Sequence, residues 1–455
     1  MDLFRKKTAA TLTTIGTPLA RCLSRFDLIL MGIGAIVGAG IFVITGIVAA
    51  TKAGPAIVLS YLIAGFTCAF AALSYAELAT TIGGCGSAYG YTYIGFGEFI
   101  AWIVGWDLLL EYSISVSTIA VGWSSYFVDF LHALNINLPI IFLKSPANSY
   151  CNINAALIII FLGILLISGI KHSARFNNTI VIIKLSVIFL FIAIAVTAVE
   201  PINWSPFMPF GWHGVIQGAA LIFFAYIGFD AVSTAAEETV NPQRDLPIGI
   251  IGSLVICAGI YILVSGLLTA IVPYKNLNVA SPISHALLAI GYKFAAGFIG
   301  AGALAGLTSV MLVWFYGLTR IFFAMARDGL LPKFFANISP ITKSPTRIIS
   351  LCGVIMSIVA AIVPMSDLAQ LVNIGTLFAF IIVCGGVIIL RYRHPNQPRV
   401  FKTPLMPLVP ILGILSSTYL IMNLSWLTIM RFIIWMIIGL IIYFCYSRYH
   451  SILNT

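Results

Sequence analysis

MGIGAIVGAGIF, at residues 31–42, places four glycines inside an apolar run that is long enough to cross a lipid bilayer. Each glycine weakens a helix by about 1 kcal/mol relative to alanine, so a helix formed here unwinds at little cost. A second apolar run, FFAYIGFDAVSTAAEE at residues 223–238, contains Gly228. The two runs predict a pair of interrupted helices inside a membrane.

The composition of the whole chain is that of a membrane protein. The 455 residues are 60% hydrophobic and 8% charged, and the mean hydropathy is +1.07. A soluble domain has roughly a quarter of its residues charged, so most of this chain lies in lipid. The net charge of +10 does not indicate nucleic-acid binding, because the basic residues follow the membrane topology and do not cluster. The scattered cysteines predict neither a disulfide framework nor a metal site.

Twelve membrane-spanning helices are predicted when about 20 apolar residues are required for each span. We therefore expect an all-α polytopic membrane protein whose first span itself directs insertion, because polar residues precede it. The predicted spans are residues 27–50, 55–79, 98–130, 153–170, 176–198, 214–238, 247–273, 295–326, 347–364, 368–390, 408–423 and 427–446.

The placement of Lys and Arg predicts that both termini are cytoplasmic. Eighteen of these residues then fall on the cytoplasmic side, five fall on the opposite side, and one, Lys184, lies within a span. This asymmetry is the one that cytoplasmic loops normally show. The five expected outside are Lys52, Lys144, Lys275, Lys293 and Arg431.

The first ten spans also predict an internal repeat. The starts of spans one to five, shifted by roughly 190 to 200 residues, fall on the starts of spans six to ten. Because five is an odd number, the second copy enters the membrane from the opposite side, as in the inverted repeats of secondary transporters. The predicted units are a cytoplasmic segment 1–26, repeats 27–198 and 214–391, a helix pair 408–447 and a cytoplasmic tail 448–455.

The paired breaks indicate a site for a zwitterion. Unwound backbone in a membrane must face a polar guest or water. The N–H groups that start a half-helix attract a carboxylate, and the carbonyls that end the preceding half attract an ammonium. An α-amino acid carries both groups. The alternative is that these glycines only permit close helix packing, but their matched positions in the two repeats favour the broken-helix site.

Ionisable residues within spans are functional candidates because lipid makes them costly. Lys184 lies deep in NTIVIIKLSVIFLF, residues 178–191. A lysine removed from water can exchange a proton near neutral pH, and its ammonium could replace a sodium ion; alternatively it is a fixed structural cation. Glu111, one turn after Asp107, could face the cavity near Lys184 or near a basic substrate side chain, or it could pair with a neighbouring helix.

Two further candidates lie around the second break. Asp230 comes two residues after Gly228, where its carboxylate could brace the unwound segment. Phe224 comes one turn before the break and could cover the ligand, although a single aromatic residue in a span is more often packed or in contact with lipid.

Three stretches resemble the amino acid, polyamine and organocation superfamily. They are GIGAIVGAGIFVITG at 32–46, WDLLLEYSISVSTIAVGWSSYF at 106–127 and FFAYIGFDAVSTAAEETVNPQRDLP at 223–247. The similarity covers the whole chain in order, and within the superfamily the chain most resembles the subgroup of cationic amino acid transporters and their bacterial relatives. It implies a leucine-transporter-type fold of five plus five inverted spans with two further helices, in a bacterial inner membrane.

The resemblance also implies roles for particular residues. By the family pattern, backbone amides around Gly38, Ala39 and Gly40 would bind the substrate carboxylate. Carbonyls near Ile36, Phe224 and Ile227 would bind the amine, and Phe224 would act as the aromatic gate. Lys184 matches the lysine that replaces sodium in proton-coupled members, near Thr308 and Ser309.

We therefore expect a secondary transporter that carries L-amino acids with protons and needs no cofactor or metal. The side chain of the substrate, neutral or cationic, stays open, and so do exchange, sodium coupling, a small accessory membrane subunit and an amino acid sensor. A channel would need rings of like residues, and none is found. No HExxH, GxSxG or Walker A motif indicates an enzyme.

Overall fold

The computed structural model is helical in the part of the chain that it describes. The described residues are 5, 23–82, 87–133, 151–168, 170–236, 239–279, 281–339 and 344–454. Most of the predicted N-terminal segment 1–26 therefore lies outside them, as do Lys6, Lys7, Arg21, Lys144 and Lys343 of the charge pattern.

Eight apolar helical segments in the described residues are long enough to cross a membrane. The first of them, Arg25–Ile82, contains the first two predicted spans. Three shorter apolar helices lie at other predicted spans: α7 (Ile153–Ile167), α14 (Thr346–Ile362) and α16 (Leu408–Met422). The chain is thus an all-α, multi-span membrane protein.

Short 3₁₀ and π turns are labelled η. The first half of the chain contains α2 (Arg25–Ile36), η1 (Gly40–Ile44), α3 (Thr45–Val48), η2 (Ala49–Ala53), η3 (Gly54–Ala56), α4 (Ile57–Ile82), α5 (Ser87–Gly95), α6 (Glu98–Ala133), α7 and α8 (Ile170–Thr197). The second half contains α9 (Gly211–Ile222), η6 (Phe223–Tyr226), α10 (Ala231–Thr234), α11 (Pro242–Ile271), α12 (Pro282–Ala289), α13 (Lys293–Arg327), α14, α15 (Met365–Arg393), α16, α17 (Trp426–Ile442), η10 (Tyr443–Ser447) and α18 (Arg448–His450).

Side chains and prolines mark where several helices begin. The Ser24 hydroxyl caps α2, and the Asp27 carboxylate accepts in return from the Ser24 N–H at 2.9 Å. Asn152 caps α7 by accepting from the Ala155 N–H at 3.1 Å. Pro242 occupies the first position of α11, where its missing N–H has no cost.

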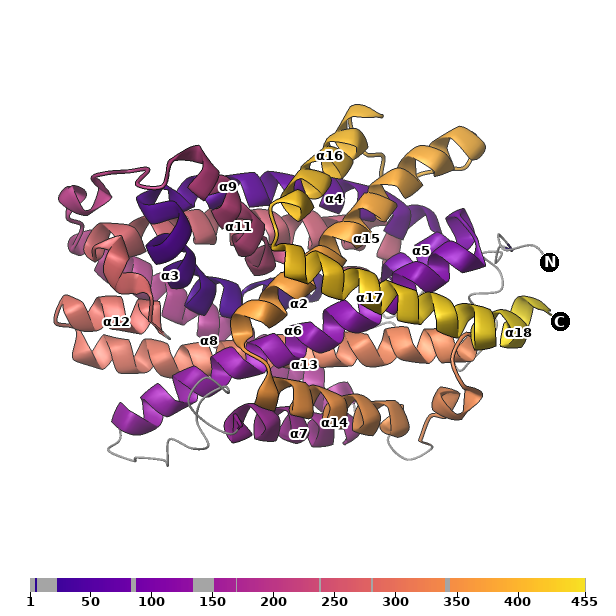
Figure 1. Ribbon diagram of the computed structural model, residues 1–455, viewed down its shortest axis with the longest axis horizontal. Helices are drawn as coiled ribbons and strands as arrows, with labels where there is room; N and C mark the ends of the chain where they lie inside the picture. The colour runs from indigo at the N-terminus through magenta and orange to yellow at the C-terminus, as the bar shows by residue number, and fades with distance from the viewer. Residues whose placement is uncertain are drawn as a thin grey trace.

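Helices of matching order in the two halves pack against each other. The α4 helix packs on α11, α6 on α13, and α7 on α14. Figure 1 shows the last two pairs: α6 and α13 lie along each other through the molecule, and α7 and α14 lie side by side at one edge. The first break, at α2 and η1, likewise contacts the second, at η6 and α10.

A buried ion pair joins the end of α4 to the end of α15. Arg391 donates to the two carboxylate oxygens of Glu77 at 2.8 and 2.7 Å. The Thr403 N–H donates to the same carboxylate at 2.7 Å, and Arg399 lies 3.4 Å from it. Glu77 is fully buried. These contacts fix the segment between α15 and α16 against α4.

A second buried carboxylate ties the C-terminal segment to the start of α6. The Glu98 side chain is fully buried and accepts from the hydroxyls of Tyr93 and Tyr443, each at 3.1 Å, and of Ser451 at 2.5 Å. The Ser447 hydroxyl donates to the Leu330 carbonyl at 2.6 Å, just beyond α13. The last helical turns therefore hold α6 and α13 together at this end of the molecule.

Candidate functional site

The α2 helix stops in the middle of the glycine-rich stretch. It ends at Ile36, and Val37 takes an extended conformation with φ −76° and ψ 97°. The chain becomes helical again in the π turn of η1, which begins at Gly40. The first N–H groups of a helix have no acceptor within it, so the backbone around Gly38, Ala39 and Gly40 presents donors at the break.

The second apolar run is interrupted in the same way. The α9 helix ends at Ile222, and a 3₁₀ turn continues to Tyr226. Ile227 is then extended, with φ −63° and ψ 136°, and Gly228 has φ +125°. Residues other than glycine rarely adopt this positive φ. A short helix, α10, resumes at Ala231.

The two breaks pack directly against each other through these glycines. A Cβ atom on Gly40 would lie 2.3 Å from the Cα atom of Ala225, and one on Gly228 would lie 2.9 Å from the carbonyl carbon of Ala35. No side chain fits at either approach. Glycine is therefore needed at both positions so that the two unwound segments can meet.

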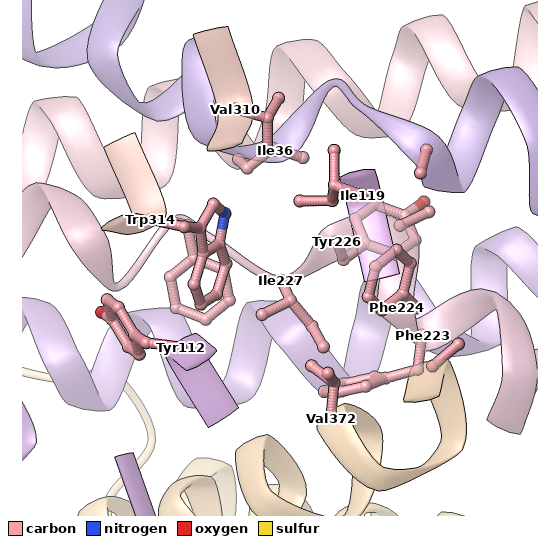
Figure 2. Close-up of a cluster of buried hydrophobic side chains, with 14 of the residues drawn as sticks. Ile36, Tyr112, Ile119, Phe223, Phe224, Tyr226, Ile227, Val310, Trp314 and Val372 are labelled. Carbon is pink, nitrogen blue, oxygen red and sulfur yellow. The ribbon is translucent and has the colours of Figure 1, made fainter. Parts of the chain in front are cut away.

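A small cavity of about 10 Å³ lies where the two breaks meet. Figure 2 shows Trp314 and Phe224 on either side of Ile227, with Ile36, Val310 and Ile119 across from it. None of the described residues that line the cavity has an ionisable side chain. The lining residues are Ala35, Ile36, Gly38, Ala39, Gly40, Ser115, Ile119, Phe224, Ile227, Val310 and Trp314.

Of the seven expected substrate-binding residues, six came from the family resemblance and Gly228 came from the glycine break, and the structure gathers those six in the cavity wall. These are Ile36, Gly38, Ala39, Gly40, Phe224 and Ile227. Gly228 lies next to them in sequence and contacts Ala35. The Ile36 carbonyl already accepts from the Tyr261 hydroxyl at 2.8 Å, and the same hydroxyl lies 2.9 Å from the Ala225 carbonyl. Tyr261 thus links the two breaks directly.

Lys184 belongs to α8, and its side chain reaches the C-terminal end of α2. Its ammonium donates to the carbonyls of Gly34 and Val37 at 2.8 and 2.9 Å, and to the Ser309 hydroxyl at 3.4 Å. The side chain is fully buried. Thr308 instead donates to the Leu304 carbonyl at 2.8 Å. Of the two expected hydroxyls, the structure therefore places only Ser309 against the lysine.

The acidic candidates gather away from Lys184. Glu111 has no hydrogen bond or ion pair with the lysine among the described residues, and it lies with Asp107 beside Gly375. Asp230 accepts from the Tyr112 hydroxyl at 3.0 Å, so α6 braces the second break. Within the described ranges, no three His, Cys, Asp or Glu side chains are placed to hold a metal ion.

Five cavity residues were not among the residues predicted from the sequence: Ala35, Ser115, Ile119, Val310 and Trp314. Ser115 and Ile119 lie one turn apart on α6, and Val310 and Trp314 lie one turn apart on α13. This spacing puts each pair on one helix face. The four-residue spacing was present in the sequence, but many other pairs in these long apolar helices share it.

Comparison with known proteins identifies the family. Residues 23–447 match the family model described as amino acid permease. Two proteins of Bacillus subtilis (strain 168) align over the whole chain and 99% of their own length: the branched-chain amino acid permease BcaP, 48% identical, and a methylthioribose transporter, 47% identical. The vacuolar cationic amino acid transporter 4 of Arabidopsis thaliana is 33% identical over 96% of this chain and 93% of its own.

These matches cover nearly the full chain and include the glycine-rich breaks that form the cavity. They also confirm the resemblance drawn from the three sequence stretches, and they assign the protein to transport and not to catalysis. The chain belongs to the amino acid permease family of the amino acid, polyamine and organocation superfamily.

Proposed function

We propose that this protein is a secondary active permease that imports neutral L-amino acids with aliphatic side chains, together with protons. The transport cycle alternates access to the cavity between the two broken helices. The observation that carries this proposal is the cavity itself, where two interrupted backbones meet around a wall without ionisable side chains.

The pairing of matching helices supports an inverted repeat. In such folds, equivalent helices of the two halves surround a site near the middle of the membrane. The contacts of α4 with α11, α6 with α13, and α7 with α14 have that arrangement. We therefore assign twelve crossings, five in each repeat of 27–198 and 214–391 and two in 408–447. Both termini are then cytoplasmic, in a bacterial cell membrane.

The free backbone groups at the breaks suit the α-amino and α-carboxylate groups of the substrate. The amides at Gly38, Ala39 and Gly40 start a helical segment and favour an anion. The carbonyls around Phe224 and Ile227 end one and favour a cation. A zwitterion satisfies both sets, so its two charges are balanced by backbone dipoles without a protein charge.

The remainder of the wall favours an uncharged side chain. Ile119, Val310 and Trp314 supply apolar surface, and none of the lining residues that the structure describes is a carboxylate that could pair with an arginine or lysine side chain. An unpaired charge in such a place is costly. This agrees with the name of the branched-chain amino acid permease that is 48% identical, and it weighs against a cationic substrate.

The position of Lys184 supports coupling to protons. Its ammonium has oxygen neighbours from Gly34, Val37 and Ser309, which are the ligands that a small hard cation would use. The ammonium therefore takes the place of a bound sodium ion. Loss of its proton removes the positive charge from the bridge between α8 and the end of α2 and weakens this bridge, and the loosening allows the first break to move.

Uptake into proteoliposomes tests this proposal. Radiolabelled L-isoleucine is offered under an inward proton gradient, an inward sodium gradient, or neither. We expect accumulation only with the proton gradient, and competition by unlabelled valine and leucine but not by arginine. Accumulation that requires sodium would refute the proton coupling, and competition by arginine would refute the neutral substrate.

The 47% identical methylthioribose transporter gives a second candidate substrate. The same assay includes methylthioribose as a competitor. A sugar lacks the zwitterion that the paired breaks favour, so we expect it to compete less well than isoleucine. Stronger competition by methylthioribose would reverse the assignment of the substrate.

A further inference from the structure

One hydroxyl on α6 differs from all the others on that helix. The helix carries six Ser and Thr residues between Glu98 and Ala133, and five of them have hydrogen-bond acceptors in the structure. The five are Ser113 with Leu109, Ser117 with Ser113 and Met356, Thr118 with Ile114, Ser124 with Asn152, and Ser125 with Val121. Ser115 is the sixth, and its Oγ atom has no partner among the described residues.

The Ser115 hydroxyl lies at the wall of the cavity. Its side chain is 1% exposed, and Ser115 lines the space where the two breaks meet. A buried serine within a helix usually donates to the carbonyl four residues earlier, as Ser113, Ser117 and Ser125 do. A buried hydroxyl without a partner is unfavourable. A hydrogen bond to a bound substrate would remove that penalty.

We propose that Ser115 is a specificity-determining residue that hydrogen-bonds a hydroxyl on the side chain of the substrate. This inference rests on the proposed function as an amino acid permease. It predicts that the cavity accepts β-hydroxy amino acids such as threonine beside aliphatic ones of the same shape such as valine. Threonine then binds in the position of valine, and its Oγ1 atom pairs with the serine.

The position of Ser115 favours the side chain of the substrate over its α-groups. The groups assigned to the α-carboxylate and ammonium come from the backbone of the two breaks, whereas Ser115 comes from α6. Its neighbour one turn later, Ile119, belongs to the apolar wall. A hydroxyl both donates and accepts, so Ser115 can pair with another hydroxyl without adding a charge to this wall.

Competition by threonine and valine isolates this contact, because the two differ only by a hydroxyl in place of a methyl group. Both are measured as competitors of isoleucine uptake by wild type and by Ser115→Ala in proteoliposomes. We expect the substitution to weaken threonine about tenfold relative to valine, since a site that loses its hydrogen-bonding group loses discrimination of that order. Valine should compete as well as before or better.

Ser117→Ala is the matched control. Its hydroxyl is buried on the same helix but donates to the carbonyls of Ser113 and Met356. The ratio of threonine to valine should not change in this variant. The melting temperatures of both purified variants, measured with each amino acid, give a second readout that depends on binding and not on transport.

The outcomes separate the two proposals. An unchanged ratio in Ser115→Ala, by competition and by melting, would overturn the role of Ser115 and leave the permease assignment intact. Equal weakening of threonine and valine would also overturn it, because the hydroxyl would then bind the α-groups. If the wild type neither took up isoleucine nor was stabilised by any amino acid, the proposed function would be refuted instead.

Discussion

Two pairs of buried carboxylates in this protein have different surroundings. At the ends of α4 and α6, Glu77 and Glu98 have several donors each. In the interior of α6, the carboxyl oxygens of Asp107 and Glu111 have no hydrogen-bond partner among the described residues. The nearby Thr376 hydroxyl donates to the Val372 carbonyl instead. The carboxylates with several donors hold the helix ends in place, whereas those without a partner lie in the interior of α6, beside α15.

The largest stability effect is expected at Glu77. Replacement by Gln removes the charge that faces Arg391 and Arg399, and leaving one partner of a buried ion pair alone costs about 3–5 kcal/mol. We therefore expect Glu77→Gln to lower the melting temperature of the detergent-solubilised protein by several degrees. A melting temperature equal to that of wild type would show that the pair does not fix this end of the molecule.

The next effect is expected where the breaks meet. A methyl group on Gly40 would lie 2.3 Å from the Cα atom of Ala225, which is backbone and cannot move away freely. We expect Gly40→Ala to cost about 1–3 kcal/mol by overpacking and to reduce isoleucine uptake at least tenfold.

The matched control for that change is Gly385→Ala. No atom lies within 4 Å of a Cβ atom built on Gly385 in α15, so this variant should be as stable as wild type or about 0.5–1 kcal/mol more stable. It should also transport normally. If both variants retained full uptake, the close approach of the two breaks would not be required for function.

A smaller effect is expected for the exposed pair of Arg431 and Asp367, which lie 2.9 Å apart. Exposed ion pairs contribute about 0–1 kcal/mol. Asp367→Asn should therefore change the melting temperature much less than Glu77→Gln. Similar losses in the two variants would show that burial does not distinguish these pairs.

The smallest stability effect is expected at Asp107, because the native carboxyl group has no hydrogen bond to any residue that the structure describes. Asp107→Asn should leave the melting temperature unchanged or raise it slightly. A loss as large as that of Glu77→Gln would show that the Asp107 carboxylate has a structural partner after all, and would remove the contrast between the two regions.

The glycine breaks were predictable from the sequence because glycine is costly in a helix and its positions are visible directly. The burial of Lys184 was predictable for a similar reason, since a lysine inside an apolar run has few alternatives. The sequence did not show which of the two adjacent residues, Thr308 or Ser309, contacts Lys184. Adjacent residues on a helix point in different directions, and only the packing of α13 against α8 decides between them.

The surroundings of Glu111 and the role of Ser115 in the cavity wall were harder to predict. Glu111 was considered as a partner for Lys184, but the structure places it beside Asp107 and Gly375 because it lies on the face of α6 that packs against α15. Ser115 was not singled out, because six hydroxyls on one helix look alike in sequence. Their hydrogen-bond partners, which differ, come from tertiary packing.

The most direct test of this account compares two kinds of transport in Lys184→Ala and Lys184→Arg proteoliposomes. Isoleucine exchange across the membrane without a gradient needs only the cavity, whereas accumulation under a proton gradient also needs a side chain that can release its proton. Arginine keeps its charge at any relevant pH.

We predict that proton-driven accumulation is lost in both Lys184 variants while exchange persists in at least the alanine variant. Lys52→Ala serves as the control, because Lys52 bonds to the Gln217 side chain at 3.3 Å on another part of the molecule, and it should keep both activities. Proton-driven accumulation by Lys184→Ala at the wild-type level would contradict the account.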